Sequence, residues 1–364
     1  MVFASDKLAG FSAICRAALT LSNRFTRQPE FTAPGMGHYR CVYMRASWLE
    51  NRFAMQSLFL ALILMAPLQV APSRTMDETV APGDNYDQAE FRLWLPEGLA
   101  SVRAIVIITP GGNGDGRPQV EYARWQAFAV KNKVALVGCR FTDKPDPQDK
   151  SRRVDLVDGQ VENYRNASRG SGKALETALT AFAKRSKHPE LATAPLLLWG
   201  MSAGGIFNYE FVAWKPERVA AFVVNKGGIY YSALLSREAR NVPGMLFIGG
   251  KDVDSAISSI TGLFAMNRSV GALWALANEP GARHEVGRSL ELARIFFEDV
   301  LSARVAPALR PMLESDGFVA DLKTKTFQPA GVLTPGDPRL TSWLPTERVA
   351  RAWQAMETGE NFER

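Results

Sequence analysis

Short apolar runs alternate with amphipathic segments along most of this chain, from residue 90 to residue 301. Six runs are almost wholly apolar, which is typical of parallel strands buried on both faces. They span residues 104–109, 134–139, 196–199, 219–224, 245–248 and 272–277. The longer segments between and after them have the apolar spacing of helices, at residues 119–131, 173–185, 256–266 and 290–301. The pattern predicts an α/β fold with a mostly parallel sheet and helices on both faces.

The same pattern divides the chain. Residues 90–96 alternate polar and apolar side chains and are expected to form an edge strand. We expect the α/β domain to span residues 89–305, with a polar linker at residues 74–88 before it. Residues 306–364 are expected to be an extension that packs on the core, with a strand or hairpin and a final helix.

The N-terminal segment has the design of an export signal. Residues 53–73 carry no charge and have a strongly apolar centre, and small residues follow that allow cleavage after Ser73. A start at Met44 would place basic residues directly before the apolar centre. We therefore expect a signal peptide at residues 44–73, an over-extended reading frame at residues 1–43, and a secreted or periplasmic protein. The alternative is a retained membrane anchor, although a span needs about 20 apolar residues and this run is shorter.

Charge and cysteine content narrow the function further. Residues 1–73 contribute +4 of the net charge of +6, so the remainder is close to neutral and gives no support to nucleic-acid binding. Beyond the leader only Cys139 is left, so no internal disulfide is expected. One cysteine and two distant histidines supply no zinc-type cluster, and no metal or other cofactor is expected. Stable membrane insertion of the mature protein is not expected either.

The sequence LLLWGMSAGGIF places Ser202 between a buried strand and a helix, in the pattern Gly-x-Ser-x-Gly. A turn this sharp brings the side chains two before and two after the serine into collision, and glycine at 200 and 204 removes it. The first helical N–H, that of Ala203, can then face a developing oxyanion. The alternative is that these glycines only allow a helix to begin.

Two further residues fit a serine nucleophile. His284 follows the last strand and is the candidate base, whereas His188 ends a basic helix and is expected to be an exposed or capping residue. Asp252 lies in the first turn after the strand at 245–248 and is the candidate acid, with Asp254 as the alternative. Glu285 is adjacent to His284 and is expected to point away from it. The order Ser, Asp, His is that of hydrolases with a nucleophile elbow.

A glycine-rich loop, PGGNGDGR, follows the strand at 104–109. Gly111 and Gly112 allow backbone N–H groups to approach a substrate oxygen, which predicts the second half of an oxyanion hole. A phosphate-binding loop is disfavoured, because no Gly-Lys-Ser/Thr follows and the glycine spacing differs from a dinucleotide fingerprint. Polar residues that follow strands at the ligand end are candidates for substrate binding: Asn113, Arg140 and Lys226.

With these motifs, residues 90–301 resemble the α/β-hydrolase superfamily. The PGGNGDGR, GMSAGG and GARHE segments resemble its secreted polyhydroxybutyrate depolymerase and feruloyl-esterase-like branch, which is dienelactone-hydrolase-like. The resemblance implies an eight-stranded sheet and hydrolysis of a small-molecule or polymer-derived ester by Ser202, Asp252 and His284. The short connection between residues 224 and 245 leaves no room for a large lid domain.

Two other functions remain open at this point. The same three residues serve peptide-bond cleavage, so a serine peptidase on the same fold is one alternative. The other is a binding protein that keeps the fold without catalysis.

Overall fold

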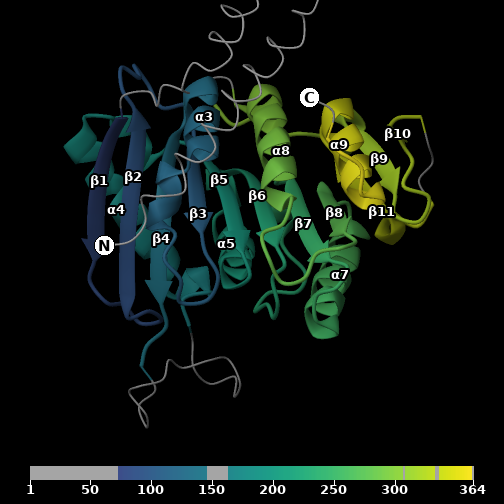
Figure 1. Ribbon diagram of the computed structural model, residues 1–364, viewed down its shortest axis with the longest axis horizontal. Helices are drawn as coiled ribbons and strands as arrows, with labels where there is room; N and C mark the ends of the chain where they lie inside the picture. The colour runs from purple at the N-terminus through teal and green to yellow at the C-terminus, as the bar shows by residue number, and fades with distance from the viewer. Residues whose placement is uncertain (1–72, 146–162, 306–307, 333–335, 363–364) are drawn as a thin grey trace, which may run out of the picture. The chain divides into compact units, whose positions relative to one another are not determined.

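A sheet of eight strands forms the centre of the fold (Figure 1). The computed structural model describes residues 73–145, 163–305, 308–332 and 336–362. The strand order is β1-β2-β4-β3-β5-β6-β7-β8. Their bounds are Ser73–Val80, Gln88–Pro96, Ile105–Thr109, Ala135–Thr142, Leu196–Met201, Val219–Asn225, Gly244–Gly249 and Trp274–Glu279 for β1 to β8. Residues 1–43, which we expect to be an over-extended reading frame, and nearly all of the expected signal peptide lie outside the described residues.

Only β2 runs against the other strands. It pairs antiparallel with β1 and with β4, and every pair from β4 to β8 is parallel. This order with one reversed strand is that of the α/β-hydrolase fold, so the predicted fold class is confirmed.

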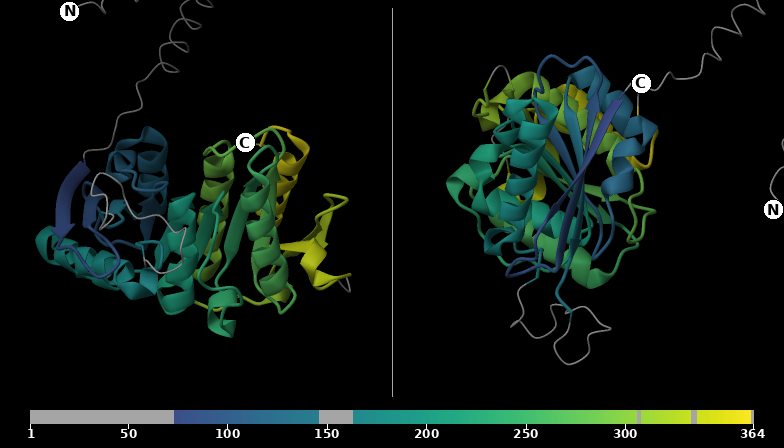
Figure 2. Two further views of the ribbon diagram at one scale, coloured as in Figure 1. Left: turned by 90° about the horizontal axis from the view of Figure 1, so that it is seen from below. Right: turned by 90° about the vertical axis from the view of Figure 1, so that its left-hand side faces the viewer.

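Helices cover both faces of the sheet (Figure 2). One layer contains α4 (Ser171–Ser186), α5 (Ala203–Trp214) and α7 (Asp254–Arg268), and the other contains α3 (Ala123–Asn132), α8 (Ser289–Arg304) and α9 (Glu347–Thr358). Along β3, Ile105 and Ile107 pack in the first layer, whereas Val106 and Ile108 pack in the second. This two-sided burial explains why the central strands are apolar throughout.

Residues 74–80 of the expected linker at residues 74–88 belong to β1, so that part is a strand of the main sheet. This edge strand buries Met76 but leaves Thr75, Asp77 and Thr79 exposed, so it lacks an apolar run. Asp77 also pairs with Arg92 across the strands, with an Nε–Oδ1 distance of 2.7 Å. Consequently β2 is covered by β1 and is not the edge strand that its alternation predicted.

The C-terminal segment packs beside β8. Strands β10 (Phe327–Pro329), β9 (Phe318–Asp321) and β11 (Thr341–Leu344) form a small antiparallel sheet, and α9 follows. Both Ser342 Oγ and Trp353 Nε1 donate to the carbonyl of Leu276, at 3.1 and 2.7 Å. The outer edge of β8 is thereby paired with side chains. Between β6 and β7 the chain forms only the short helix α6 (Arg237–Arg240). No helix within the four described stretches is both long enough and apolar enough to cross a membrane.

Candidate active site

Ser202 stands at a strained turn between β5 and α5. Its φ and ψ are 53° and −119°, a backbone conformation that L-residues rarely adopt. A Cβ added to Gly200 would lie 2.3 Å from the carbonyl oxygen of Gly204, and one added to Gly204 would lie 2.2 Å from that of Thr109. Both glycines are therefore required sterically, as the sequence predicted. This geometry is that of a nucleophile elbow.

The hydroxyl of Ser202 is hydrogen-bonded to an imidazole that is in turn bonded to a carboxylate. The Oγ atom of Ser202 lies 2.9 Å from Nε2 of His284. The Nδ1 atom of His284 lies 3.0 and 3.2 Å from the two carboxylate oxygens of Asp252. The His284 side chain is 44% exposed, whereas that of Asp252 is 2% exposed, so the imidazole faces solvent above a buried carboxylate.

Two neighbouring loops supply the acid and the base. Asp252 follows β7, and its own N–H donates to the carbonyl of Gly249 at 3.0 Å. The loop after β7, which carries Asp252, is joined to the loop after β8, which carries His284. The connection is a 2.9 Å hydrogen bond from Lys251 N to Ala282 O. Asp254 is the first residue of α7 and is exposed.

Glu285 and His188, the two residues that the sequence disfavoured as acid and base, form hydrogen bonds elsewhere. The carboxylate of Glu285 accepts the N–H of Arg283 at 3.2 Å. The ring of His188 lies 2.9 Å from Glu190, next to the end of α4.

The glycine loop after β3 lies against the elbow. A Cβ on Gly111 would be 3.7 Å from Ser202 Cβ, and one on Gly112 would be 3.8 Å from Ala203 Cβ. Ala203 begins α5, where the first N–H groups have no partner within a helix. The three residues expected at an oxyanion hole are thus next to Ser202 or adjacent to it in sequence.

Each of the three residues expected to bind substrate is held by contacts within the protein, and each lies in a different environment. Asn113 adopts a φ of 55° on the glycine loop, and its Oδ1 accepts the N–H of Asp143 at 2.7 Å. Arg140 pairs with Glu90, with an Nη1–Oε2 distance of 2.9 Å, on the neighbouring strand. Lys226 is fully buried, and its Nζ lies 3.2 Å from Oε2 of Glu279.

Sequence reasoning missed Asn225 and Glu279, the two partners of Lys226. A signal was present, because both are polar residues at strand ends: β6 is otherwise apolar, and β8 is apolar up to Asn278.

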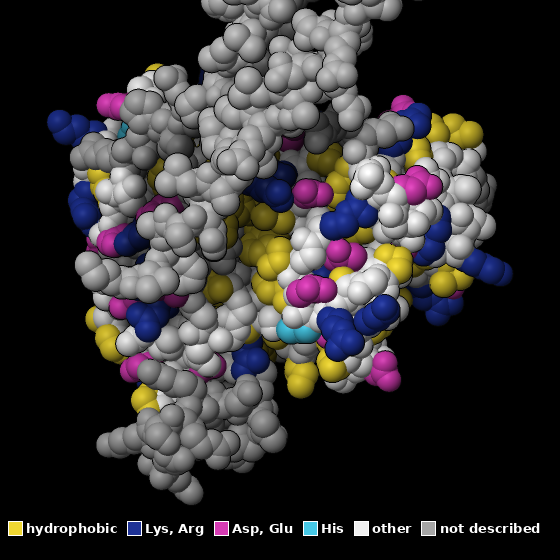
Figure 3. All heavy atoms as spheres, viewed as in Figure 1, with side chains coloured by type: hydrophobic (Ala, Val, Ile, Leu, Met, Phe, Trp, Pro, Cys, Tyr) yellow, Lys and Arg dark blue, Asp and Glu magenta, His cyan; other side chains and the backbone are white. Residues whose placement is uncertain are grey.

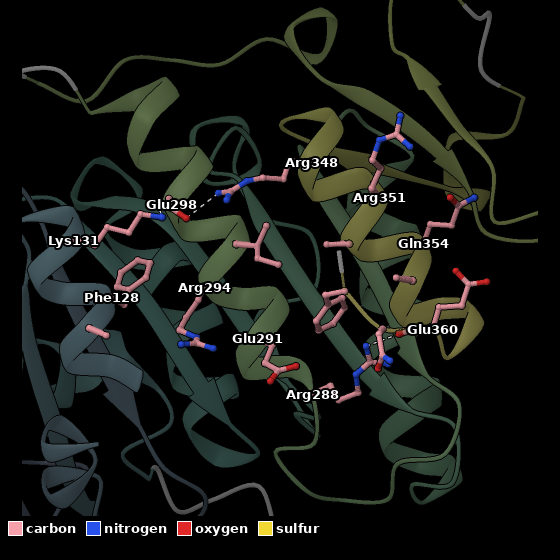
Figure 4. Close-up of a pocket in the computed structure, with 16 residues that line it drawn as sticks. Phe128, Lys131, Arg288, Glu291, Arg294, Glu298, Arg348, Arg351, Gln354 and Glu360 are labelled. Atoms are coloured by element: carbon pink, nitrogen blue, oxygen red, sulfur yellow. Dashed lines mark hydrogen bonds and ion pairs between the residues drawn. The ribbon is translucent and has the colours of Figure 1, made fainter. Parts of the chain in front are cut away.

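A separate groove of about 980 Å³ lies between α3, α8 and α9, on the face drawn in Figure 3 (Figure 4). Lys131 and Arg348 reach toward Glu298 from α3 and α9, and Phe128 lines the wall. Basic and acidic side chains are interspersed over the part of this face where described residues are visible. None of Ser202, Asp252 and His284 lines the groove, so its volume is no measure of a site at the elbow.

Cys139 is the one cysteine among the described residues. Burial raises the pKa of its thiol, which keeps it protonated and unsuited to act as a nucleophile. Within the described ranges, no group of three or more His, Cys, Asp or Glu side chains is placed to hold a metal ion.

The fold is that of the α/β-hydrolases, and several solved structures are similar to it. One is poly(aspartic acid) hydrolase-1 from Sphingomonas sp. KT-1, with a TM-score of 0.45, 13% identity, and coverage of 61% of this chain and 98% of that one. Another is S-formylglutathione hydrolase (FrmB) from Staphylococcus aureus, with a TM-score of 0.43, 10% identity, and coverage of 64% and 98%. A thermostable esterase has a TM-score of 0.41, 13% identity, and coverage of 56% and 54%.

No protein-family model matches the chain, and no curated protein matches its sequence. The fold is defined by the strand order and by the reversed β2, not by these likenesses.

Proposed function

We propose that this chain is a serine hydrolase that cleaves carboxylic esters through an acyl-enzyme. The observation that carries the proposal is the continuous set of hydrogen bonds from Ser202 through His284 to Asp252, which begins at a strained elbow. Neither a helix start nor a packing role requires a serine at φ 53° in line with an imidazole and a buried carboxylate.

The proposed reaction has two halves. Ser202 Oγ attacks the ester carbonyl carbon while His284 Nε2 takes the hydroxyl proton. The bond to the alcohol then breaks, and the alcohol leaves with that proton. Water next attacks the acyl-enzyme with His284 as base, which frees the acid and restores Ser202. Asp252 holds the imidazole and stabilises its protonated form.

The oxyanion that forms in each half is stabilised by backbone donors. We assign this role to the N–H of Ala203 and to that of Gly111 or Gly112, because Gly111 lies against Ser202 and Gly112 lies against Ala203. The proposed mechanism uses no cofactor.

The substrate class within this proposal is a small-molecule or polymer-derived ester, as in the secreted polyhydroxybutyrate depolymerase and feruloyl-esterase-like branch. Exposed apolar side chains follow the acid and the base, Val253 at 62% and Val286 at 38% exposure, and they favour an ester with an apolar group. Export through residues 44–73 is part of the proposal. It predicts a mature chain that begins at Arg74, within β1, which N-terminal sequencing of the native protein tests.

A substrate panel tests the bond that is cleaved. Short acyl esters, a feruloyl ester, an acetylated sugar and a hydroxybutyrate oligomer are assayed beside peptides, each with the wild type and with Ser202→Ala. The proposal expects ester turnover that is lost in Ser202→Ala. Turnover of peptides without turnover of any ester would replace the esterase by the serine peptidase.

A further inference from the structure

A buried polar cluster formed by Asn225, Lys226 and Glu279 lies between the segments that carry the three proposed catalytic residues. Asn225 and Lys226 are fully buried, and the Glu279 side chain is 12% exposed. Lys226 Nζ donates to Glu279 Oε2 at 3.2 Å and to Asn225 Oδ1 at 3.3 Å. We refer to these residues as the Lys226 cluster.

The cluster contacts the serine and acid segments. The carbonyl of Asn225 accepts the N–H of Ser202 at 2.8 Å, which joins it to the elbow. A Cβ on Gly249 would lie 2.9 Å from Lys226 Cε, so the lysine stem packs against the start of the acid loop.

The base segment, residues 280–288, has the most contacts with the cluster. The second carboxylate oxygen of Glu279 accepts the N–H of Arg288 at 2.8 Å, at the far end of the segment. Asn225 Nδ2 donates to the carbonyl of Val286 at 3.4 Å. Gly287, at φ 55°, lies so close to Glu279 that an added Cβ would come within 2.2 Å of the carboxylate.

This anchoring matters because the base segment has no regular structure of its own. Residues 283–287 are exposed and lie between the end of β8 and the start of α8. A buried ion pair contributes little net stability, since desolvation offsets the attraction, but removing one partner leaves a costly unpaired charge. The placement of the pair therefore favours a role in fixing one position of this segment.

We propose that Lys226 and Glu279 are positioning residues, which hold residues 280–288 so that His284 stays within hydrogen-bond reach of Ser202. The inference rests on the proposed hydrolase function. It assigns Lys226 to the support of the base and not to substrate binding, since the side chain has no exposed surface. Because neither residue touches the substrate, their loss is expected to lower kcat and to leave KM nearly unchanged.

The test compares steady-state kinetics of wild type, Lys226→Met and Glu279→Ala on an ester that the wild type hydrolyses. Each single variant is expected to lose about 10- to 100-fold in kcat, with KM within about threefold of wild type, because a displacement of about 1 Å at the reacting groups costs up to 100-fold. The rate of Ser202 labelling by a fluorophosphonate is expected to fall in parallel.

The double variant Lys226→Met/Glu279→Gln covers the case in which Lys226→Met does not fold. It removes both charges, and the amide oxygen at 279 still accepts the N–H of Arg288. We expect it to fold but to keep a kcat at least about tenfold below wild type, because the hydrogen bond from Lys226 Nζ that holds residue 279 is lost. A folded double variant with kcat within about threefold of wild type would overturn the positioning role of Lys226.

A matched control is the ion pair of Lys215 with Glu176, 2.6 Å apart, at the opposite end of α5 from Ser202. Lys215→Met and Glu176→Ala are expected to lower Tm without lowering kcat. If the Lys226 and Glu279 variants also lower only Tm, or raise KM at constant kcat, the positioning role is wrong. Failure of the wild type itself to hydrolyse esters or to be labelled would instead reject the proposed function.

Discussion

At the scale of single residues, the most unusual feature is the backbone conformation of Ser202, with φ 53° and ψ −119°, which Gly200 and Gly204 make sterically possible. A non-glycine residue in such a conformation costs on the order of 1–3 kcal/mol. The structure retains this strain at the serine whose hydroxyl meets the imidazole of His284.

Replacing Ser202 separates strain from chemistry. Both Ser202→Ala and Ser202→Gly remove the hydroxyl, but only glycine adopts this conformation without a steric penalty. We expect Ser202→Gly to be more stable than Ser202→Ala by about 1 kcal/mol or more, as measured by denaturant unfolding. Equal stability of the two variants would mean that the elbow is not strained.

Glu210 provides a second test at this scale. Its carboxylate, on the buried face of α5, accepts the N–H groups of Tyr231 and Ser232 and the hydroxyl of Ser232. Burial nevertheless raises the pKa of Glu210 above the ordinary carboxyl range. The folded state thus binds this proton more tightly than the unfolded state, so stability is lost as pH rises from about 4.3 through the raised pKa.

Glu210→Gln keeps the shape and removes that titration. We expect the variant to be as stable as wild type near pH 3.5 and to become more stable than wild type as pH rises above about 4.5. Urea unfolding at several pH values measures the two free energies of unfolding. A stability difference that does not change with pH would show that Glu210 does not titrate in this way.

At the scale of elements, the glycine loop and the elbow depend on each other. Gly204→Ala places a methyl group against the carbonyl of Thr109, a backbone atom that cannot move without shifting the loop that carries Gly111. We expect a loss of about 1–3 kcal/mol in stability together with a fall in kcat. Gly262→Ala is the control, because Gly262 lies inside α7 with nothing within 4 Å, and alanine there is expected to stabilise by up to about 1 kcal/mol. Equal effects of the two changes would contradict this interpretation.

The elements also show how far the sequence leads. The runs at β3, β5, β6 and β7 are apolar because both faces are covered, and that pattern was sufficient to predict them. Strand β1 escaped prediction because an edge strand with one buried face needs few apolar residues.

Part of the candidate site could be predicted from the order of the strands and their loops. Loops that leave parallel strands at the carboxyl end converge, which brought Ser202, Asp252 and His284 together. The direction of single side chains depends on register, which the sequence does not state. Arg140 lies opposite Glu90 in the pairing of β2 with β4 and bonds to it. Lys226 itself adopts a φ of 52°, and its side chain points into the protein.

At the scale of the whole unit from Val70 to Arg364, the C-terminal segment covers the outer edge of β8. Trp353 on α9 is fully buried against β8, and its indole N–H bonds to Leu276. The apolar side chains that this segment buries with the second helix layer include Leu344, Val349 and Met356. An edge strand covered in this way is protected from pairing with another chain.

Trp353→Ala tests that contribution. We expect a loss of about 3–5 kcal/mol, a large part of the stability of a typical domain, because a large cavity opens beside β8. Leu340→Ala, at a side chain that is 59% exposed, is expected to change stability by less than about 0.5 kcal/mol. Thermal and denaturant unfolding measure both, and similar small losses would mean that the segment does not complete the core.

The central claim is that Ser202 is a nucleophile activated by His284. The most direct measurement is covalent labelling with a fluorophosphonate, with the modified residue located by peptide mass spectrometry. We predict one labelled site, Ser202, in the wild type, and no labelling in Ser202→Ala. In His284→Ala, labelling of Ser202 is expected to be slowed by about 1,000-fold or more. An unlabelled wild type that is folded, or labelling that survives Ser202→Ala at the same rate, would contradict the claim.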